Sequence, residues 1–247
     1  MMAPFYDVEA MIRPFLPSVA LVLMLTPLVA AYAIGAAVLA GWLRTVKHIA
    51  APYTRKIFHF SIFTMAGVIQ LTIGLPGVVI FGCVVSLAVL WAIYRGDSFP
   101  LYEALARPSD RPRRTLFIVV PLLTTAVGGV LANLLFARMA FVGYLVCGWG
   151  DALGEPVGTR WGKHRYRVPS LAGVPATRSL EGSSAVFLAG AAAAFLGLTI
   201  AGVTPMTAAL VALAAGLTGA VVEAFSTHGL DNLTVQVAAA AAAFFLL

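Results

Sequence analysis

Long apolar runs recur along the whole chain and limit the folds available to it. Eight can be marked out, and most approach the roughly 20 residues that an α-helix needs to cross a bilayer. They are 18–41, 57–73, 76–94, 115–136, 139–149, 183–202, 205–222 and 233–247. The fifth run reaches spanning length only if it continues to about Glu155. We therefore expect an all-α integral membrane protein with about eight transmembrane helices, or seven if one of the short runs does not span.

The composition of the chain indicates the same class. Hydrophobic residues make up 61% of the 247 residues and charged residues 11%, against about one half and one quarter in soluble domains. We expect a single polytopic membrane domain over residues 1–247. Asp7 and Glu9 precede an apolar run that is too long for a signal peptide, so no cleaved leader is expected. Cys83 and Cys147 lie in apolar runs, which predicts small buried residues rather than a disulfide framework or a metal site.

The ionisable residues are concentrated in alternate connections between the apolar runs. The connections at 42–56, 95–114, 148–182 and 223–232 are long and polar, whereas the others are short. With eight spans, the long connections share one face, and of the 16 lysines and arginines only Arg13 and Arg138 lie outside it. The positive-inside rule places that face in the cytoplasm, with the protein in the plasma (inner) membrane of a prokaryote. The net charge of +6 is thereby explained without nucleic acid.

Few polar residues interrupt the apolar runs. Gln70, Thr124, Thr125 and Asn133 are the clearest cases, and we expect them to form hydrogen bonds between helices. A channel or carrier would more often place charges at mid-membrane. The alanine-rich runs at 191–194 and 238–243 suit close helix packing in lipid.

The connection 148–182 carries the densest charge and is read as a cytoplasmic, glycine-rich loop. Its acidic residues are Asp151, Glu155 and Glu181, and its basic residues are Arg160, Lys163, Arg165, Arg167 and Arg178. Carboxylates can hold a divalent metal, while cations and glycine N–H groups can hold a phosphate. This combination predicts a site for a metal-bound phosphate. The alternative is a solvated loop without a function of its own.

Asp151 and Glu155 are four residues apart, which places both carboxylates on one face of a helix. Pro156 disfavours helix at Glu155, so we expect the helix to end there, at the membrane boundary. Two neighbouring carboxylates repel unless a cation lies between them, and Mg²⁺ commonly uses one or two carboxylates plus substrate phosphates. Separately solvated charges at a helix end are the alternative.

The residues that follow are suited to binding anions. Gly158, Gly162 and Lys163 form a cationic turn that is not a P-loop, because His164 stands where Ser or Thr is required. The segment 177–184 then leads into the next apolar run, where a Ser or Thr is expected to cap the helix and its N-terminus to attract anions. Glu181 there interacts either with the helix dipole or with a metal.

Two further groups belong to the same face. Arg55, Lys56 and His59 begin the second apolar run at helical spacing, so they can point toward one place. Glu223, Asp231 and Asn232 lie in or next to the last long connection. Membrane anchoring explains Arg55 and Lys56 equally well, and plain salt bridges would explain the acidic residues.

These motifs in order resemble the polyprenol kinase family, which includes phytol kinases, farnesol kinases and the C-terminal part of dolichol kinases. The motifs are Arg55-Lys56-x-x-His59, Gly150-Asp151-Ala152 through Gly158 and Gly162-Lys163, then 178–183 (RSLEGS), Glu223 and 231–234 (DNLT). The resemblance covers about the last four-fifths of the chain and is specific only in combination. It implies a multi-span enzyme that uses CTP to phosphorylate an isoprenoid alcohol. Many relatives have Lys where this chain has Arg178, and the short length is closest to the phytol kinase branch.

The resemblance also implies roles for individual residues. Mg²⁺ would be held by Asp151 with help from Glu155, Glu181, Glu223 or Asp231. The nucleotide and its phosphates would contact a larger set, namely Arg55, Lys56, Gly158, Arg160, Gly162, Lys163, Arg165, Arg178, Ser179, Gly182 and Asn232. The general base is open between Asp151, Glu155 and His59.

Two other functions remain open. A membrane cytidylyltransferase of the CDP-diacylglycerol synthase kind is suggested faintly by 228–231 (HGLD). A transporter or lipid-binding scaffold with a basic cytoplasmic face is the non-enzymatic alternative.

Overall fold

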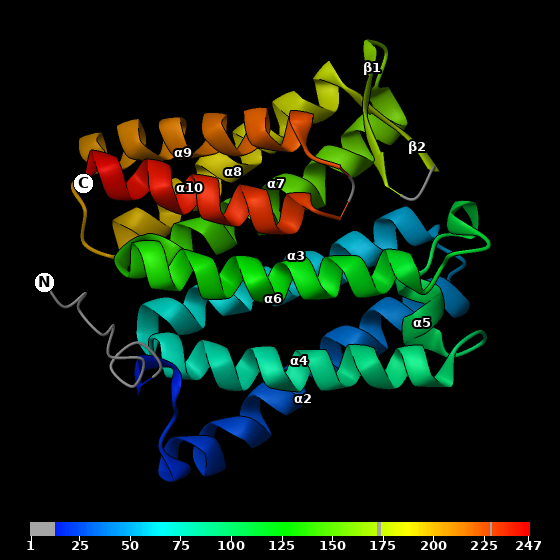
Figure 1. Ribbon diagram of the computed structural model, residues 1–247, viewed down its shortest axis with the longest axis horizontal. Coiled ribbons are helices and arrows are strands. Elements are labelled where there is room, and N and C mark those ends of the chain that lie inside the picture. The colour runs from blue at the N-terminus through cyan, green and yellow to red at the C-terminus, as the bar shows by residue number, and fades with distance from the viewer. Residues whose placement is uncertain (1–12, 172–173, 228) are drawn as a thin grey trace, which may run out of the picture.

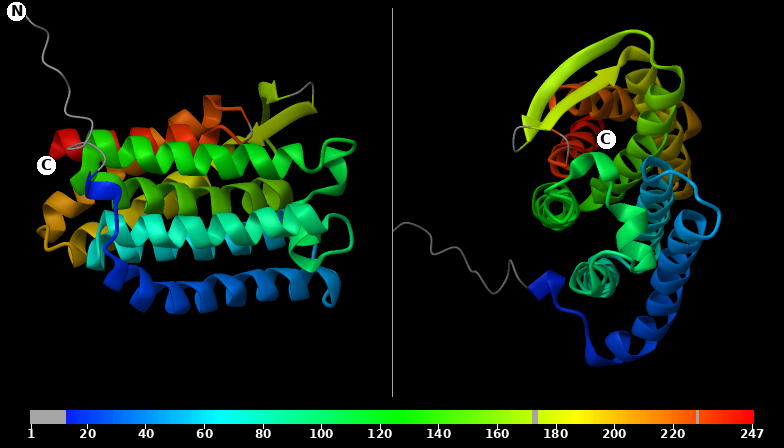
Figure 2. Two further views of the ribbon diagram at one scale, coloured as in Figure 1. Left: turned by 60° about the horizontal axis from the view of Figure 1, so that its bottom comes forward. Right: turned by 90° about the vertical axis from the view of Figure 1, so that its right-hand side faces the viewer.

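The structure, a computed structural model, describes residues 13–171, 174–227 and 229–247 (Figure 1). Its long helices run alongside one another as a bundle (Figure 2). In the described residues they are α2 (Val19–Thr45), α3 (Ala51–Thr72), α4 (Leu75–Arg95), α6 (Leu116–Phe136), α7 (Ala140–Trp161), α8 (Leu180–Ile200), α9 (Pro205–Phe225) and α10 (Asp231–Leu246). Each predicted apolar run lies within or largely overlaps one of them, which confirms the α-helical membrane class.

Fewer segments meet the length and hydropathy needed to cross a membrane than there are long helices. Five segments are long and apolar enough to cross a membrane, namely Val19–Thr45, Leu75–Arg95, Leu116–Trp161, Leu180–Ile200 and Pro205–Phe225. The third of these contains both α6 and α7. The helix α3 is not among them, since it carries Arg55, Lys56 and His59, and α10 is shorter. Eight spans therefore stay a prediction.

The short elements lie at the two ends of the bundle. The helix α5 (Pro100–Leu105), the 3₁₀ turn η2 (Pro108–Asp110) and an antiparallel hairpin of β1 (Arg165–Leu171) and β2 (Val174–Ser179) belong to the long polar connections. The 3₁₀ turns η1 (Arg13–Phe15), before α2, and η3 (Ala137–Met139), between α6 and α7, lie outside these connections. Figure 1 shows α5 and the hairpin at one end and the C-terminus at the other. Which end faces the cytoplasm stays a prediction.

The helix α7 is the centre of the fold, and residues 140–148 of it are buried without a break. It packs against α3, α8 and α10. Glycines allow these contacts: a Cβ added at Gly150 would lie 3.0 Å from Val186 Cγ1 of α8, and one added at Gly148 would overlap Phe63 of α3. Small residues at helix contacts let backbones approach closely in a membrane protein.

One expectation about the stretch 148–182 is wrong. The helix α7 does not end at Glu155 but continues to Trp161 with Pro156 inside it, because its last turns pack on α8 through Gly154 and Gly158. This packing outweighs the roughly 3 kcal/mol that proline costs inside a helix. After a short connection, the rest of the stretch up to α8 contains the hairpin, in which Tyr166 pairs with Arg178.

The polar residues within the helices form the expected interhelical hydrogen bonds. Gln70 Nε2 of α3 donates to Asn133 Oδ1 of α6 over 3.0 Å. Thr125 Oγ1 of α6 accepts from Asn232 Nδ2 of α10 over 2.9 Å, and Thr124 donates to the Gly229 carbonyl. The alanine-rich runs also pack closely as expected, with Ala193 and Ala194 of α8 and Ala239, Ala240 and Ala243 of α10 fully or almost fully buried.

Candidate active site

Three carboxylates from three helices meet at the hairpin end of the bundle. Asp151 lies in α7, Glu223 near the end of α9 and Asp231 at the start of α10, and one oxygen of each lies within 4.8 Å of the others. Such a concentration of negative charge is unfavourable unless cations balance it. We call these three residues the carboxylate cluster.

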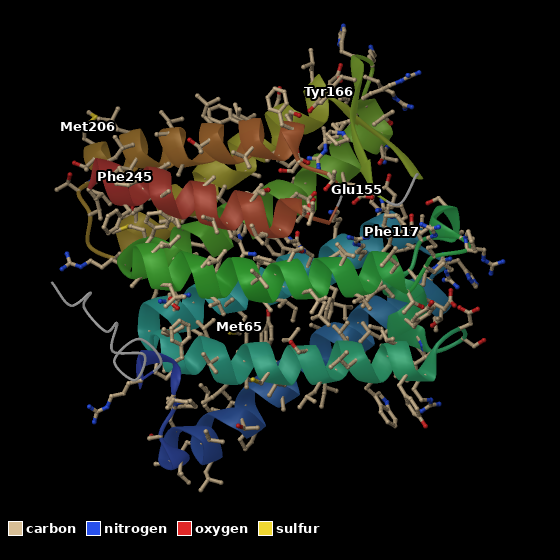
Figure 3. The ribbon with its side chains drawn as sticks, in the orientation of Figure 1. Met65, Phe117, Glu155, Tyr166, Met206 and Phe245 are labelled. Atoms are coloured by element: carbon tan, nitrogen blue, oxygen red, sulfur yellow. The ribbon has the colours of Figure 1, made fainter. Side chains whose placement is uncertain are left out.

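Lys56 of α3 balances one side of the cluster. Its side chain is 3% exposed, and its Nζ lies 2.6 Å from Asp151 Oδ1 and 2.9 Å from Glu155 Oε2. Arg107, in the connection after α5, lies 2.7 Å from Glu155 Oε1 through Nη1. Burial disfavours the charged guanidinium, but the charges of Glu155 and Asp110 outweigh it and hold the pKa of Arg107 above its ordinary value. Glu155 therefore faces two cations, at the position labelled in Figure 3.

Arg178 of β2 balances the other side. Its guanidinium pairs with Glu223 and with Asp231 Oδ2, the latter over 3.0 Å, and it donates to the Ser226 carbonyl over 3.3 Å. The planar fork of arginine suits such multiple contacts. The hairpin is thereby fixed to the end of α9 and the start of α10, beside the carboxylate cluster.

A polar cavity of about 290 Å³ opens beside the cluster. Most of the predicted site residues line it: Asp151, Glu155, Gly158, Arg165, Arg178, Ser179, Gly182, Glu223 and Asp231. Arg107, Gly154, Thr159, Val168, Thr177 and Ser183 line it as well. The long polar connections at 95–114, 148–182 and 223–232 thus contribute residues to the same cavity.

The N-terminus of α8 forms one wall of this polar cavity. Ser179 is its N-cap, as the sequence predicted for a Ser or Thr, and its side chain accepts from the Gly182 N–H over 3.1 Å. Gly182 lies so close to α7 that an added Cβ would be 2.9 Å from the Gly154 carbonyl oxygen. A helix N-terminus carries partial positive charge and attracts anions. The cavity therefore joins a carboxylate cluster to an anion-binding helix end.

Several predicted site residues lie apart from the cluster. Glu181 accepts from the Lys163 N–H over 3.1 Å and lies 2.7 Å from His164 Nδ1. Arg160 and Lys163 are both exposed. The Arg160 guanidinium makes a cation–π contact with the Trp161 ring. Gly162 is the C-cap of α7, and a Cβ added there would overlap Ser179. The structure does not bring these four residues to the polar cavity.

His59, Arg55 and Asn232 lie on the far side of Asp151. His59 Nε2 is 3.4 Å from Asp151 Oδ2, and its ring stacks on Phe63. All three residues line a smaller cavity of about 90 Å³. The Asn232 side chain donates to Thr125 on α6, so its amide is committed to the interior of the bundle. Of the predicted phosphate ligands, Arg55 and Asn232 thus face away from the polar cavity.

Sequence reasoning missed the role of Arg107. It begins a basic run, 107–114, that is indistinguishable in sequence from charges that orient a membrane protein. Lys56 was singled out, but as a phosphate ligand rather than as the partner of Asp151 and Glu155. Both partners are distant in the chain, and only the packing of α3 on α7 brings them together.

Comparison with known proteins agrees with this picture. A curated protein named phytol kinase, from Synechocystis sp., is 32% identical to this chain over 194 residues, which cover 77% of each of the two proteins. No model of a protein family matches the chain, and no solved structure gives a significant match. The chain belongs to the family of the phytol and polyprenol kinases, as the order of its motifs predicted.

Proposed function

We propose that this protein transfers the γ-phosphoryl group of CTP to the hydroxyl of an isoprenoid alcohol, such as phytol, geranylgeraniol or a longer polyprenol or dolichol. One observation carries the proposal. The carboxylate cluster, the partly buried Arg107 and Arg178, and the N-terminus of α8 line a single cavity in a bundle of membrane helices. The relative named phytol kinase supports an alcohol as acceptor. CTP as donor rests on the resemblance of the motifs.

The nucleotide phosphates would lie in the polar cavity, between the N-terminus of α8 and the cations Arg107, Arg165 and Arg178. Phosphoryl transfer depends mainly on positioning and on neutralising charge on the transferred group. Ser179 caps the first turn of α8 by accepting from the Gly182 N–H, and Gly158 and Gly182 let α7 and α8 approach closely beside the cavity. These features suit a polyphosphate better than a single carboxylate.

The carboxylate cluster fits a divalent cation. Oxygen ligands from three acidic side chains within 4.8 Å of one another suit Mg²⁺. Asp151, Glu223 and Asp231 would hold it, and it would neutralise charge on the β- and γ-phosphates. Lys56 pairs with Asp151, and Arg178 pairs with Glu223 and Asp231, so these cations balance the charge of the carboxylates and fix their orientation.

The proton of the alcohol needs an acceptor. Asp151 contacts Lys56, and Glu155 contacts both Lys56 and Arg107, and a carboxylate stabilised by cations is a weak base. His59 lies beside Asp151, and its Nε2 is buried with no hydrogen-bond partner among the described residues. We therefore favour His59 as the residue that accepts or orients the proton.

The experiment that tests this function follows two radiolabels. Purified protein with Mg²⁺ and phytol or geranylgeraniol should move the γ-label of CTP to the lipid and release CDP, and chelation of Mg²⁺ should abolish transfer. Transfer of the α-label to phosphatidate, with release of pyrophosphate and no phosphorylated alcohol, would instead establish a cytidylyltransferase. ATP, GTP and UTP in parallel test the choice of nucleotide.

A further inference from the structure

An apolar groove of about 320 Å³ runs between α3, α4 and α6. Its volume lies near the lower end of the roughly 300–1,000 Å³ typical of small-molecule sites. Ile62 and Ala66 of α3, Val78 and Gly82 of α4, and Leu122 and Ala126 of α6 are among its lining residues. The phosphate chemistry proposed above makes no use of this groove.

The groove leads toward the carboxylate cluster. It shares Ile62, Phe63, Val85, Leu122 and Thr125 with the small cavity of about 90 Å³. That cavity ends at Arg55, His59 and Asn232. His59 in turn lies 3.4 Å from Asp151, which lines the polar cavity. The groove and the small cavity therefore form one path that ends at His59, and His59 contacts Asp151 in the wall of the polar cavity.

The head of this path holds two buried polar atoms whose hydrogen-bonding capacity is unused within the described residues, and one of them, His59 Nε2, lies 3.4 Å from Asp151 Oδ2. Arg55 Nη1 and His59 Nε2 have no hydrogen-bond partner among the described residues. An unsatisfied buried polar group costs about 1–3 kcal/mol. A ligand that carries a hydroxyl and reaches this point would satisfy them. The lining of the path is thus mostly apolar along its length, and it carries hydrogen-bonding side chains where it reaches Arg55 and His59.

The length of the path suits a hydrocarbon chain. Along α4 its lining extends from Leu75 to Val89, which at 1.5 Å per helical residue is roughly 21 Å. This is about two thirds of the hydrocarbon thickness of a bilayer. At the far end Asn133 and Tyr144 line the groove and are joined by a hydrogen bond of 2.7 Å.

We propose that this groove binds the hydrocarbon chain of the acceptor alcohol, with the hydroxyl at His59 and Arg55 and the chain lying along α4 toward Asn133. The inference rests on the proposed function, because it identifies the acceptor with an isoprenoid alcohol. A diterpenoid chain such as phytyl lies along the path, whereas a much longer polyprenol must leave it on its open side. The groove therefore favours acceptors of the phytol and geranylgeraniol class.

One variant tests the groove through activity. A Cβ added at Gly82 meets no atom within 4 Å, so Gly82→Phe fills the groove without displacing a helix. Gly82 is seven residues from Val89, roughly 10 Å along α4. A short acceptor such as geraniol fits in the part of the path between His59 and the new phenylalanine, whereas the longer chain of phytol does not. We expect kcat/KM for phytol to fall at least tenfold and that for geraniol to change less than threefold.

The matched control is Gly35→Phe on α2. Gly35 is also a helical glycine with no atom within 4 Å of an added Cβ, but it lines none of the cavities described here. This variant should leave kcat/KM unchanged for both alcohols. Equal effects of the two substitutions would overturn the assignment of the groove.

A second measurement does not depend on catalysis. Cys83 is exposed on the groove, contrary to the expectation of a buried residue, whereas Cys147 is buried as expected. Modification of Cys83 by N-ethylmaleimide, followed by mass spectrometry, should slow at least threefold with saturating geranylgeraniol. Glycerol-based lipid at the same concentration should give no protection. Equal protection by both would identify the groove as a site for ordinary bilayer lipid and overturn the proposal.

The two measurements separate this inference from the proposed function. Protection of Cys83 without phosphorylation of any alcohol would retain the groove as an isoprenoid site and reject the kinase. Phosphorylation of phytol without protection, and with Gly82→Phe equal to Gly35→Phe, would retain the kinase and reject the groove.

Discussion

Single residues hold this site together because its charges are buried in opposite pairs. Lys56 is 3% exposed, and it contacts two carboxylates at 2.6 and 2.9 Å. Removing one partner of a buried ion pair typically costs about 3–5 kcal/mol, since the other charge is left uncompensated. The polar cavity is therefore sensitive to charge as well as to shape.

Arg178 gives a prediction at this scale. Its fork contacts Glu223, Asp231 and the Ser226 carbonyl together. Arg178→Lys keeps the charge but has one ammonium for three contacts, so we expect kcat to fall by about three- to tenfold. Arg178→Gln removes the charge and should lower kcat at least a hundredfold. Steady-state kinetics of both purified variants check this, and equal activity of the glutamine and wild-type proteins would contradict it.

Most residues of the site could be predicted from the sequence, but the ion pairs between them could not. Asp151, Arg178 and Ser179 were recognised from local spacing and residue type, and all three line the polar cavity. That Lys56 pairs with Asp151, and that Arg107 belongs to the site, follows from contacts between residues far apart in the chain. Spacing along one helix carries no information about such contacts.

At the scale of elements, the contact between α7 and α8 sets the width of the polar cavity. An added Cβ at Gly182 would lie 2.9 Å from the Gly154 carbonyl oxygen and 3.3 Å from Gly158 Cα. Gly182→Val must therefore push the two helices apart. We expect a loss of stability of about 1–3 kcal/mol, measured as a lower melting temperature in detergent, together with weaker nucleotide binding.

Gly35→Val is the control for Gly182→Val. Its added atoms meet open space on α2, so melting temperature and nucleotide affinity should stay at their wild-type values. A melting temperature of Gly182→Val equal to that of Gly35→Val would show that this helix contact is not tight.

The elements themselves were largely predictable, because apolar runs of spanning length allow little except helices in lipid. The hairpin and the last turns of α7 were not. Pro156 is a strong local signal against helix, and only the glycine contacts with α8 overcome it. Tertiary packing of this kind cannot be inferred from the local sequence.

At the scale of the whole molecule, the charged connections and the site lie at one end of the bundle (Figures 1 and 3). Ser109 lies in η2, in one of these connections, and Ala137 lies in η3, after α6. Both are exposed. In a variant with Cys83 and Cys147 replaced by alanine, a cysteine at Ala137 should react with an impermeant thiol reagent in intact cells.

A cysteine at Ser109 should react only after lysis, because the positive-inside rule places it in the cytoplasm. Labelling of Ser109 before lysis would reverse the orientation and place the site outside the cell, where CTP is scarce.

The carboxylate cluster is the centre of the whole account, and Asp151→Asn tests it most directly. The amide keeps the size of the side chain but loses the charge, and Glu155 still compensates Lys56, so the protein should insert, purify and melt as the wild type does. Asp97→Asn is the matched control, since Asp97 is 69% exposed and pairs with Arg114. The measurement is transfer of the γ-label from CTP to phytol. We predict a loss of at least a hundredfold for Asp151→Asn and wild-type transfer for Asp97→Asn, whereas transfer by Asp151→Asn within threefold of wild type would contradict the account.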